Sequence, residues 1–208
     1  MQRAIPSVSL LPCVALGTAL ITAGMGTSAL ADEMCYGHQL FSEPRPAESC
    51  HEIVPQIYAS PDGDLRAFVV PAGVSLYATP DIESRVVIRS ANGTTLTSQD
   101  YSSPRGTNGY YADQAKWSSD SQFFVFSMMS SGGHSPWSFP TMAYSRERNM
   151  IAKVSDMIGG RPILSGDFQL SAPHTLSIIT WGRDGDMEDK VKVTLDLAEE
   201  FAKLPEPQ

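Results

Sequence analysis

The stretch SPDGDLRAFVV, residues 60–70, places a tight turn directly before an apolar strand. Proline presets the backbone at the first central position of a turn, and glycine lets the chain leave the turn without a Cβ clash. A short arm, Gln56 to Ala59, precedes the turn. Residues 55–70 are therefore predicted to form strand, turn and strand.

A second stretch, SSDSQFFVFSM at residues 118–128, aligns with the first at a spacing of 58 residues. It also places small polar residues before an apolar strand. Phe123 and Val125 alternate along this strand with Phe124 and Phe126, so both of its faces are apolar. Strands of this kind are buried on both sides, and we expect this one to lie centrally.

Further strands follow from alternating apolar residues between turn signals, of which Asn92-Gly93 is the strongest. They are expected at 82–89, 94–97, 141–145 and 149–154. A third, weaker copy begins near Phe168, with strands at 175–181 and 190–197 and a short helix from 197 to 204 before Pro205. Large apolar residues, mostly at alternate positions, predict the core: Tyr36, Tyr58, Phe68, Val70, Val86, Ile88, Trp117, Phe124, Phe126, Met128, Ile151, Ile178 and Trp181.

Four short antiparallel strands per roughly fifty residues, repeated along a chain, are typical of β-propeller blades. The SPDG turn with its apolar strand, and WSSDSQFFVFS after it, resemble the blades of TolB-type propellers over residues 53–130. The resemblance implies a scaffold that binds proteins or ligands, and in some relatives a domain attached to a peptidase.

The chain has room for three such blades at most, whereas closed propellers have about four to eight. We therefore expect an all-β fold of two to three consecutive antiparallel meander sheets, an open or partial propeller, with a short C-terminal helix. A dimer that completes a ring and a sandwich whose turns mimic blades are the alternatives.

The first thirty-one residues are typical of a cleaved secretory signal. Arg3 is followed by a largely apolar stretch from Val8 to about Ala23, and Ala29-Leu30-Ala31 forms a cleavage site. The apolar run is too short for a membrane span. We therefore expect the mature chain to be periplasmic or secreted. It should form a single domain over residues 32–208, with a C-terminal tail from residue 198.

The charge excludes nucleic acid as a partner. The full chain has a formal net charge of −8. Signal cleavage would remove the positive charge of Arg3 and so make the mature chain more negative by one charge. A chain this acidic repels nucleic acid and anionic lipid.

Cys35 and Cys50 remain after signal cleavage, and an even pair in an exported chain predicts a disulfide that staples residues 32–52. The alternative is a metal site that adds His38 and His51, but zinc ligands are usually more closely spaced. We expect no metal and no cofactor.

The most unusual segment is the connector SSGGHSPWSFP, residues 130–140, between two apolar strands. Glycines allow close backbone approach to a ligand, and aromatic faces beside a titratable group suit sugars, peptides or cations. The candidate binding residues are Gly132, Gly133, His134, Trp137, Phe139 and, at a distance, Trp181. The alternative is an ordinary connection with Trp137 packed against the core.

These features favour an exported, non-catalytic module that binds a protein, a peptide or a cell-envelope glycan. The alternatives are a small secreted serine-type hydrolase that uses His134, and an accessory or inhibitor subunit of a periplasmic complex. Asp113, Asp120, Asp156 and Asp167 could each orient a histidine in a hydrolase, and nothing in the sequence selects one of them. No G-x-S-x-G motif occurs. We assign no catalytic residue.

Overall fold

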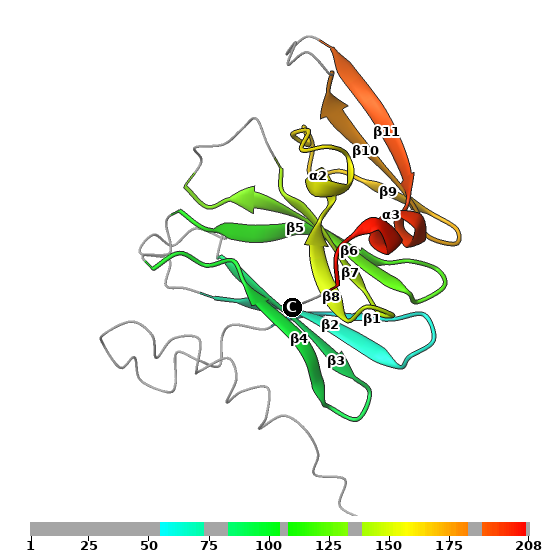
Figure 1. The fold of residues 1–208 in the computed structure, drawn as a ribbon. Helices are drawn as coiled ribbons and strands as arrows, with labels where there is room; N and C mark the ends of the chain where they lie inside the picture. Colours follow the sequence, from blue (N-terminus) through cyan, green and yellow to red (C-terminus); the bar gives the residue numbers. More distant parts are fainter. Residues whose placement is uncertain (1–54, 73–82, 105–107, 133–138, 183–188, 207–208) are drawn as a thin grey trace, which may run out of the picture.

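Antiparallel sheets that follow one another in sequence lie one above the next (Figure 1). The computed structural model describes residues 55–72, 83–104, 108–132, 139–182 and 189–206. Within these residues the chain forms three meander sheets, none of them closed, a one-turn helix α2 (Val154–Met157) and a short C-terminal helix. The expected all-β fold of open, blade-like sheets is confirmed.

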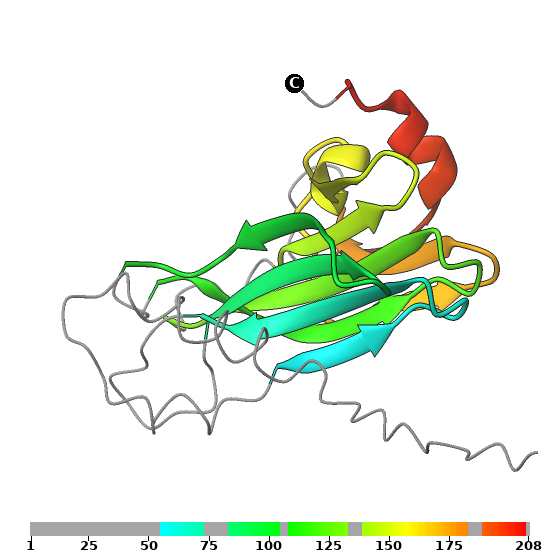
Figure 2. The same ribbon diagram turned by 90° about the horizontal axis from the view of Figure 1, so that it is seen from below.

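Sheet 1 contains β1 (Gln56–Ala59), β2 (Leu65–Pro71), β3 (Ser84–Ser90) and β4 (Thr95–Asp100), in that order. Sheet 2 contains β5 (Tyr110–Trp117), β6 (Phe123–Ser130), β7 (Thr141–Ser145) and β8 (Met150–Lys153), again in chain order. Sheet 3 contains β9 (Gln169–Ser171), β10 (Thr175–Trp181) and β11 (Lys190–Asp196), with β10 in the middle. Figure 2 shows the strands of sheets 1 and 2 running in nearly the same direction.

The SPDG segment forms the turn between β1 and β2 through its own side chains. Ser60 Oγ donates a hydrogen bond to the Asp62 carboxylate at 2.6 Å and accepts one from the Leu65 N–H at 3.0 Å. Gly63 has φ +79°, the left-handed backbone that glycine adopts at no steric cost.

The turn between β5 and β6 repeats this arrangement. Ser118 Oγ donates to the Asp120 carboxylate at 2.6 Å and accepts from the Phe123 N–H at 2.9 Å. Ser121 occupies the left-handed position, with φ 63°. The 58-residue spacing predicted from the sequence is therefore confirmed for the pairs Ser60/Ser118, Asp62/Asp120, Gly63/Ser121 and Leu65/Phe123.

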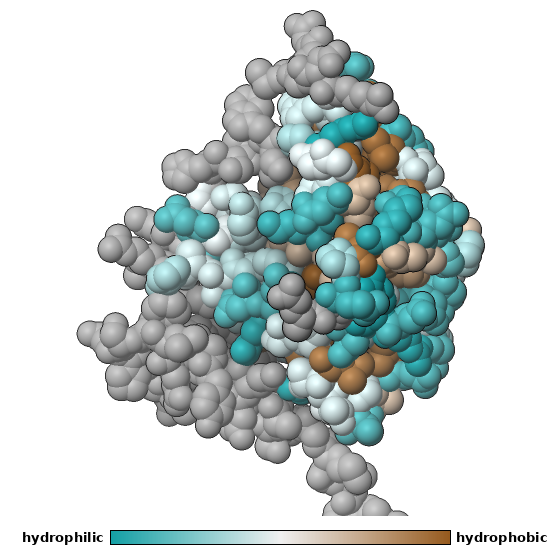
Figure 3. Space-filling view, in the orientation of Figure 1, coloured by the Kyte–Doolittle hydropathy of each residue, from teal (hydrophilic) through white to brown (hydrophobic). Residues whose placement is uncertain are grey.

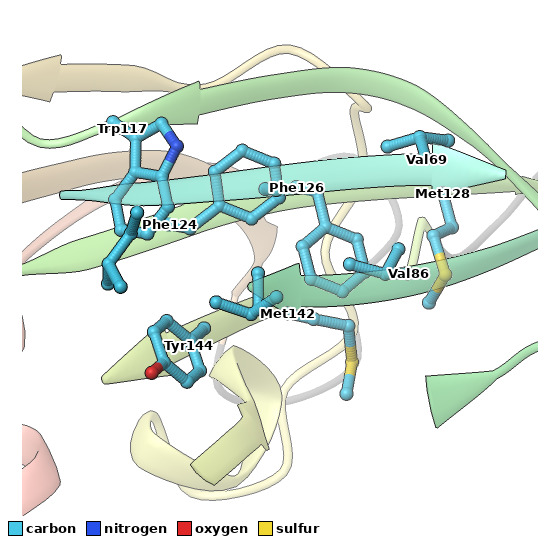
Figure 4. Close-up of a cluster of buried hydrophobic side chains, with 11 residues drawn as sticks. Val69, Val86, Trp117, Phe124, Phe126, Met128, Met142 and Tyr144 are labelled. Atoms are coloured by element: carbon cyan, nitrogen blue, oxygen red, sulfur yellow. The ribbon is translucent and has the colours of Figure 1, made fainter. Parts of the chain in front are cut away.

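β6 lies between two cores. Phe124 and Phe126 face sheet 1, whereas Phe123 and Val125 face sheet 3, and all four are buried. The prediction of a strand that is buried on both faces is confirmed. Figure 4 shows the core between sheets 1 and 2, whose buried members are Leu65, Ala67, Val69, Val86, Ile88, Trp117, Phe124, Phe126, Met128, Met142 and Tyr144.

Sheet 3 covers the other face of sheet 2. Leu176 and Ile178 of β10 belong to the second core, as does Phe201 of α3 (Leu197–Lys203). Asp196 begins α3, because its carboxylate accepts the Ala198 and Glu199 N–H groups at 2.9 and 3.1 Å. The expected short helix before Pro205 is confirmed.

One core prediction needs correction, because the residue lies on a different face of its strand. Trp181 is only half-buried and lies on the face of β10 opposite to Ile178. Phe68 and Val70 are buried as predicted, and with Val87 they form a separate core cluster on the face of sheet 1 turned away from sheet 2.

In the view of Figure 3, hydrophilic side chains cover most of the visible coloured surface, and hydrophobic ones appear as small patches. Among the described residues, Ile57 is the one large hydrophobic side chain classed as exposed. Extended apolar patches are a common mark of interaction sites. On the part of the chain that the structure describes, cavities and polar clusters are therefore the better candidates for a site.

Candidate functional site

The connector between β6 and β7 is described at its two ends. Gly132 and Phe139 lie within the described residues, whereas Gly133, His134 and Trp137 lie outside them. Cys35 and Cys50 also lie outside, so the disulfide stays a prediction.

Phe139 and Trp181 are attached to the same short segment. The Phe139 N–H donates to the Ile163 carbonyl at 2.8 Å, and the Trp181 N–H donates to the neighbouring Pro162 carbonyl at 3.4 Å. The structure thus brings these two candidates to one part of the fold, although they are far apart in sequence.

A cavity of about 370 Å³ lies beside Phe139. Its lining is mainly apolar and aromatic, with a few polar side chains: Gln99, Tyr101, Tyr110, Met128, Phe139, Pro140, Thr141, Met142, Lys153, Ser155 and Ile163. Its size and composition are those of a small-molecule or side-chain pocket.

Strand register explains how two polar side chains reach this cavity. Gln99 of β4 pairs with Val86, and Lys153 of β8 pairs with Met142. Val86 and Met142 belong to the core between sheets 1 and 2. Because paired residues share a face of the sheet, Gln99 and Lys153 lie on the two faces that are turned toward each other.

Tyr101 forms part of the cavity wall. Its ring lies edge-on to Phe126, with 5.7 Å between the centroids. Its hydroxyl is buried and has no hydrogen-bond partner among the described residues. Burial raises the pKa of Tyr101, so the side chain is neutral.

A buried carboxylate holds the start of the connector. Glu83 is 1% exposed and accepts hydrogen bonds from Ser131 Oγ at 2.6 Å, from Ser103 Oγ at 2.8 Å, and from the N–H groups of Ser103 and Gly109. A Cβ at Gly109 would lie 2.5 Å from both Glu83 Cδ and the Tyr101 carbonyl oxygen, so the close approach requires glycine.

Burial acts to raise the pKa of Glu83, but the hydrogen bonds from Ser131, Ser103 and Gly109 outweigh it and lower that pKa. The carboxylate therefore stays ionised. We name Glu83, Ser103, Gly109 and Ser131 the Glu83 cluster. Sequence reasoning missed this cluster, because its members are 20 to 48 residues from Glu83 and no local motif joins them.

A second polar cluster joins sheet 2 to sheet 3. His174 Nδ1 lies 2.5 Å from Asp120 Oδ2, and its Nε2 lies 3.3 Å from Asp196 Oδ1. The imidazole packs edge-on against Phe123, with 5.4 Å between the centroids. The structure thus pairs Asp120 with His174, a histidine that sequence reasoning had left without a role.

Burial acts to raise the pKa of Asp120, but hydrogen bonds from Ser118, His174 and the Gln122 backbone together lower it. Both ring nitrogens of His174 face carboxylates. A general base needs a free nitrogen toward its nucleophile, so we assign this cluster to the joining of the sheets.

Within the described ranges, no group of three or more histidine, cysteine, aspartate or glutamate side chains is placed to hold a metal ion. No helix in this part of the chain is long and apolar enough to cross a membrane. No protein-family model matches the chain, and no curated protein sequence matches it.

Proposed function

We propose that this chain is an exported, non-catalytic β-repeat module, built of TolB-like blades, that binds a protein, a peptide or a cell-envelope glycan. The observation that carries the proposal is the cavity of about 370 Å³ beside Phe139, at the end of the glycine-rich connector. Export rests on the signal-like residues 1–31.

Rigid supports at both ends of the connector favour a binding role. Ser131 is held by Glu83, and Phe139 is held by the Ile163 carbonyl. Loops that are fixed on a rigid scaffold are where binding residues concentrate, because the scaffold bears the ordering cost before the ligand arrives.

The walls of the cavity suit recognition of an apolar group. Met128 and Met142 supply adaptable apolar surface, while Tyr110 and Phe139 supply flat aromatic faces. The few polar groups in the lining can then orient the bound group.

The proposal is tested by affinity capture from a cell-envelope extract, with the mature chain as bait and captured molecules identified by mass. Phe139→Ala and Trp137→Ala should each lose the captured partner while the thermal midpoint stays within a few degrees of the parent chain. Ile57→Ala changes an exposed apolar residue on sheet 1 and serves as the control. Equal capture by all four proteins would refute the proposed binding site.

A further inference from the structure

We infer that the cavity beside Phe139 receives an apolar group that carries a carboxylate, such as the carboxyl-terminal apolar residue of a peptide or a free aryl carboxylic acid. This inference rests on the proposed function and names the ligand class of the same site.

Lys153 supplies the charge. It is the one residue of the described cavity lining with a charged side chain at neutral pH. No described carboxylate lies within ion-pair distance of its ammonium group, although the chain as a whole is acidic. Among the described residues, the cavity therefore has a cation without a counter-ion, whereas Arg146 is paired with Asp62 and Asp64.

The position of Lys153 fits a ligand that is apolar at one end and anionic at the other. Lys153 ends β8 and is exposed, whereas its register partner Met142 is 2% exposed in the core. The apolar and cationic parts of the lining are thus neighbours on one face of sheet 2. A ligand of matching polarity would bury its apolar body and keep its carboxylate at the ammonium group.

The polar neighbours of Lys153 in the lining are neutral. The Gln99 amide can donate hydrogen bonds to a carboxylate oxygen without adding charge, whereas the hydroxyls of Thr141 and Ser155 already donate to the Phe139 carbonyl and to Asp156. One cation with a neutral donor matches one carboxylate. Polyanions such as nucleic acid would in addition be repelled by the net charge of −8.

Isothermal titration calorimetry with two matched probe pairs tests the inference. The first pair is a capped tripeptide that ends in phenylalanine, as the free acid and as the amide. The second pair is phenylpropionate and phenylpropionamide. We expect each acid to bind about tenfold more tightly than its amide, the size of one charge-assisted hydrogen bond.

Lys153→Gln should reduce both acids to the affinity of their amides, whereas Lys190→Gln, on the exposed β11 edge, should change neither. Tighter binding of the peptide acid than of phenylpropionate would assign the ligand to a chain terminus, and equal binding would assign it to a free acid. Equal binding of acid and amide, no binding of either, or an acid preference that survives Lys153→Gln would overturn the inference. Loss of envelope capture by Phe139→Ala would still support the proposed function in those cases.

Discussion

The indole Nε1 of Trp117 donates a hydrogen bond to the backbone carbonyl oxygen of Tyr58 at 2.8 Å. Trp117 ends β5 and Tyr58 lies in β1, so the bond joins an edge strand of sheet 2 to an edge strand of sheet 1. The Trp117 ring also packs against Phe124, with 5.2 Å between the centroids. The two sheets are thus held together by side chains, because their strands do not pair with each other.

Trp117→Phe should destabilise the protein by about 2–3 kcal/mol. The change leaves the Tyr58 carbonyl without its donor and opens a space in the core. Urea denaturation followed by circular dichroism measures the free energy of unfolding. Trp181→Phe, at a half-buried position on sheet 3, is the control and should cost less than about 1 kcal/mol. A Trp117→Phe variant as stable as this control would contradict the assigned role of the bond.

Arg146, in the turn after β7, forms ion pairs with Asp62 and Asp64 in the turn before β2. We expect this contact between sheets 2 and 1 to weaken in acid. The hydrogen bond from Ser60, aided by Arg146, lowers the pKa of Asp62 from 3.8 to about 2. Because the folded-state pKa is the lower one, ionised Asp62 stabilises the fold above pH 3.8, and this stabilisation is lost as the pH falls toward 2.

Titration of the Asp62 carboxyl by NMR should give a midpoint well below that of an unfolded aspartate. Asp62→Asn should remove part of the stability difference between pH 6 and pH 3, by less than about 1 kcal/mol, because the site is partly exposed. Glu147→Gln, in an exposed turn beside Arg146, should leave that difference unchanged. An ordinary Asp62 midpoint would refute the prediction.

Glu83→Gln should destabilise the protein by about 2–4 kcal/mol. An amide group presents its own N–H donors to the donors of Ser103, Gly109 or Ser131, so buried groups lose their partners. Ser131→Ala removes one of these hydrogen bonds and should cost about 1 kcal/mol. Because the pKa of Glu83 is lowered in the fold, its contribution is present above its ordinary pKa and fades on acidification. Chemical denaturation at pH 7 and pH 3 measures how much Glu83→Gln lowers the free energy of unfolding at each pH. An equal loss at the two pH values would contradict the predicted pH dependence.

Tyr101→Phe should raise stability by about 1 kcal/mol, because it removes a buried hydroxyl that has no partner among the described residues. Tyr144→Phe is the matched control. Its hydroxyl donates to Asn149 Oδ1 at 3.2 Å, so the same deletion should lower stability. Thermal unfolding of both variants gives the sign of each change. A loss of stability in Tyr101→Phe would show that its hydroxyl has a partner after all.

Local chemistry made much of the fold predictable. Ser60 and Ser118 each bond to residues no more than five positions away, so the turns are encoded within short stretches. The apolar residues on both faces of β6 likewise showed its central place, because burial on two sides needs no knowledge of which strands cover it.

The clusters that join distant segments could not be predicted in this way. Glu83 collects donors from Ser103 and Ser131, and His174 meets Asp120 across 54 residues. A single charged residue in a polar stretch looks the same in sequence whether it is solvated or enclosed. Trp181 was predicted as a core residue from its apolarity, but it is only half-buried, because it lies on the face of β10 opposite to Ile178.

Because β6 contributes Phe124 to one interior and Val125 to the other, the molecule cannot be divided into independent units. A fragment that stopped after β8 would leave Phe123 and Val125 in water, and a fragment that began at β5 would do the same to Phe124 and Phe126. The three sheets should therefore unfold together in a single cooperative transition. Truncation from either end should yield aggregates in place of a smaller folded protein.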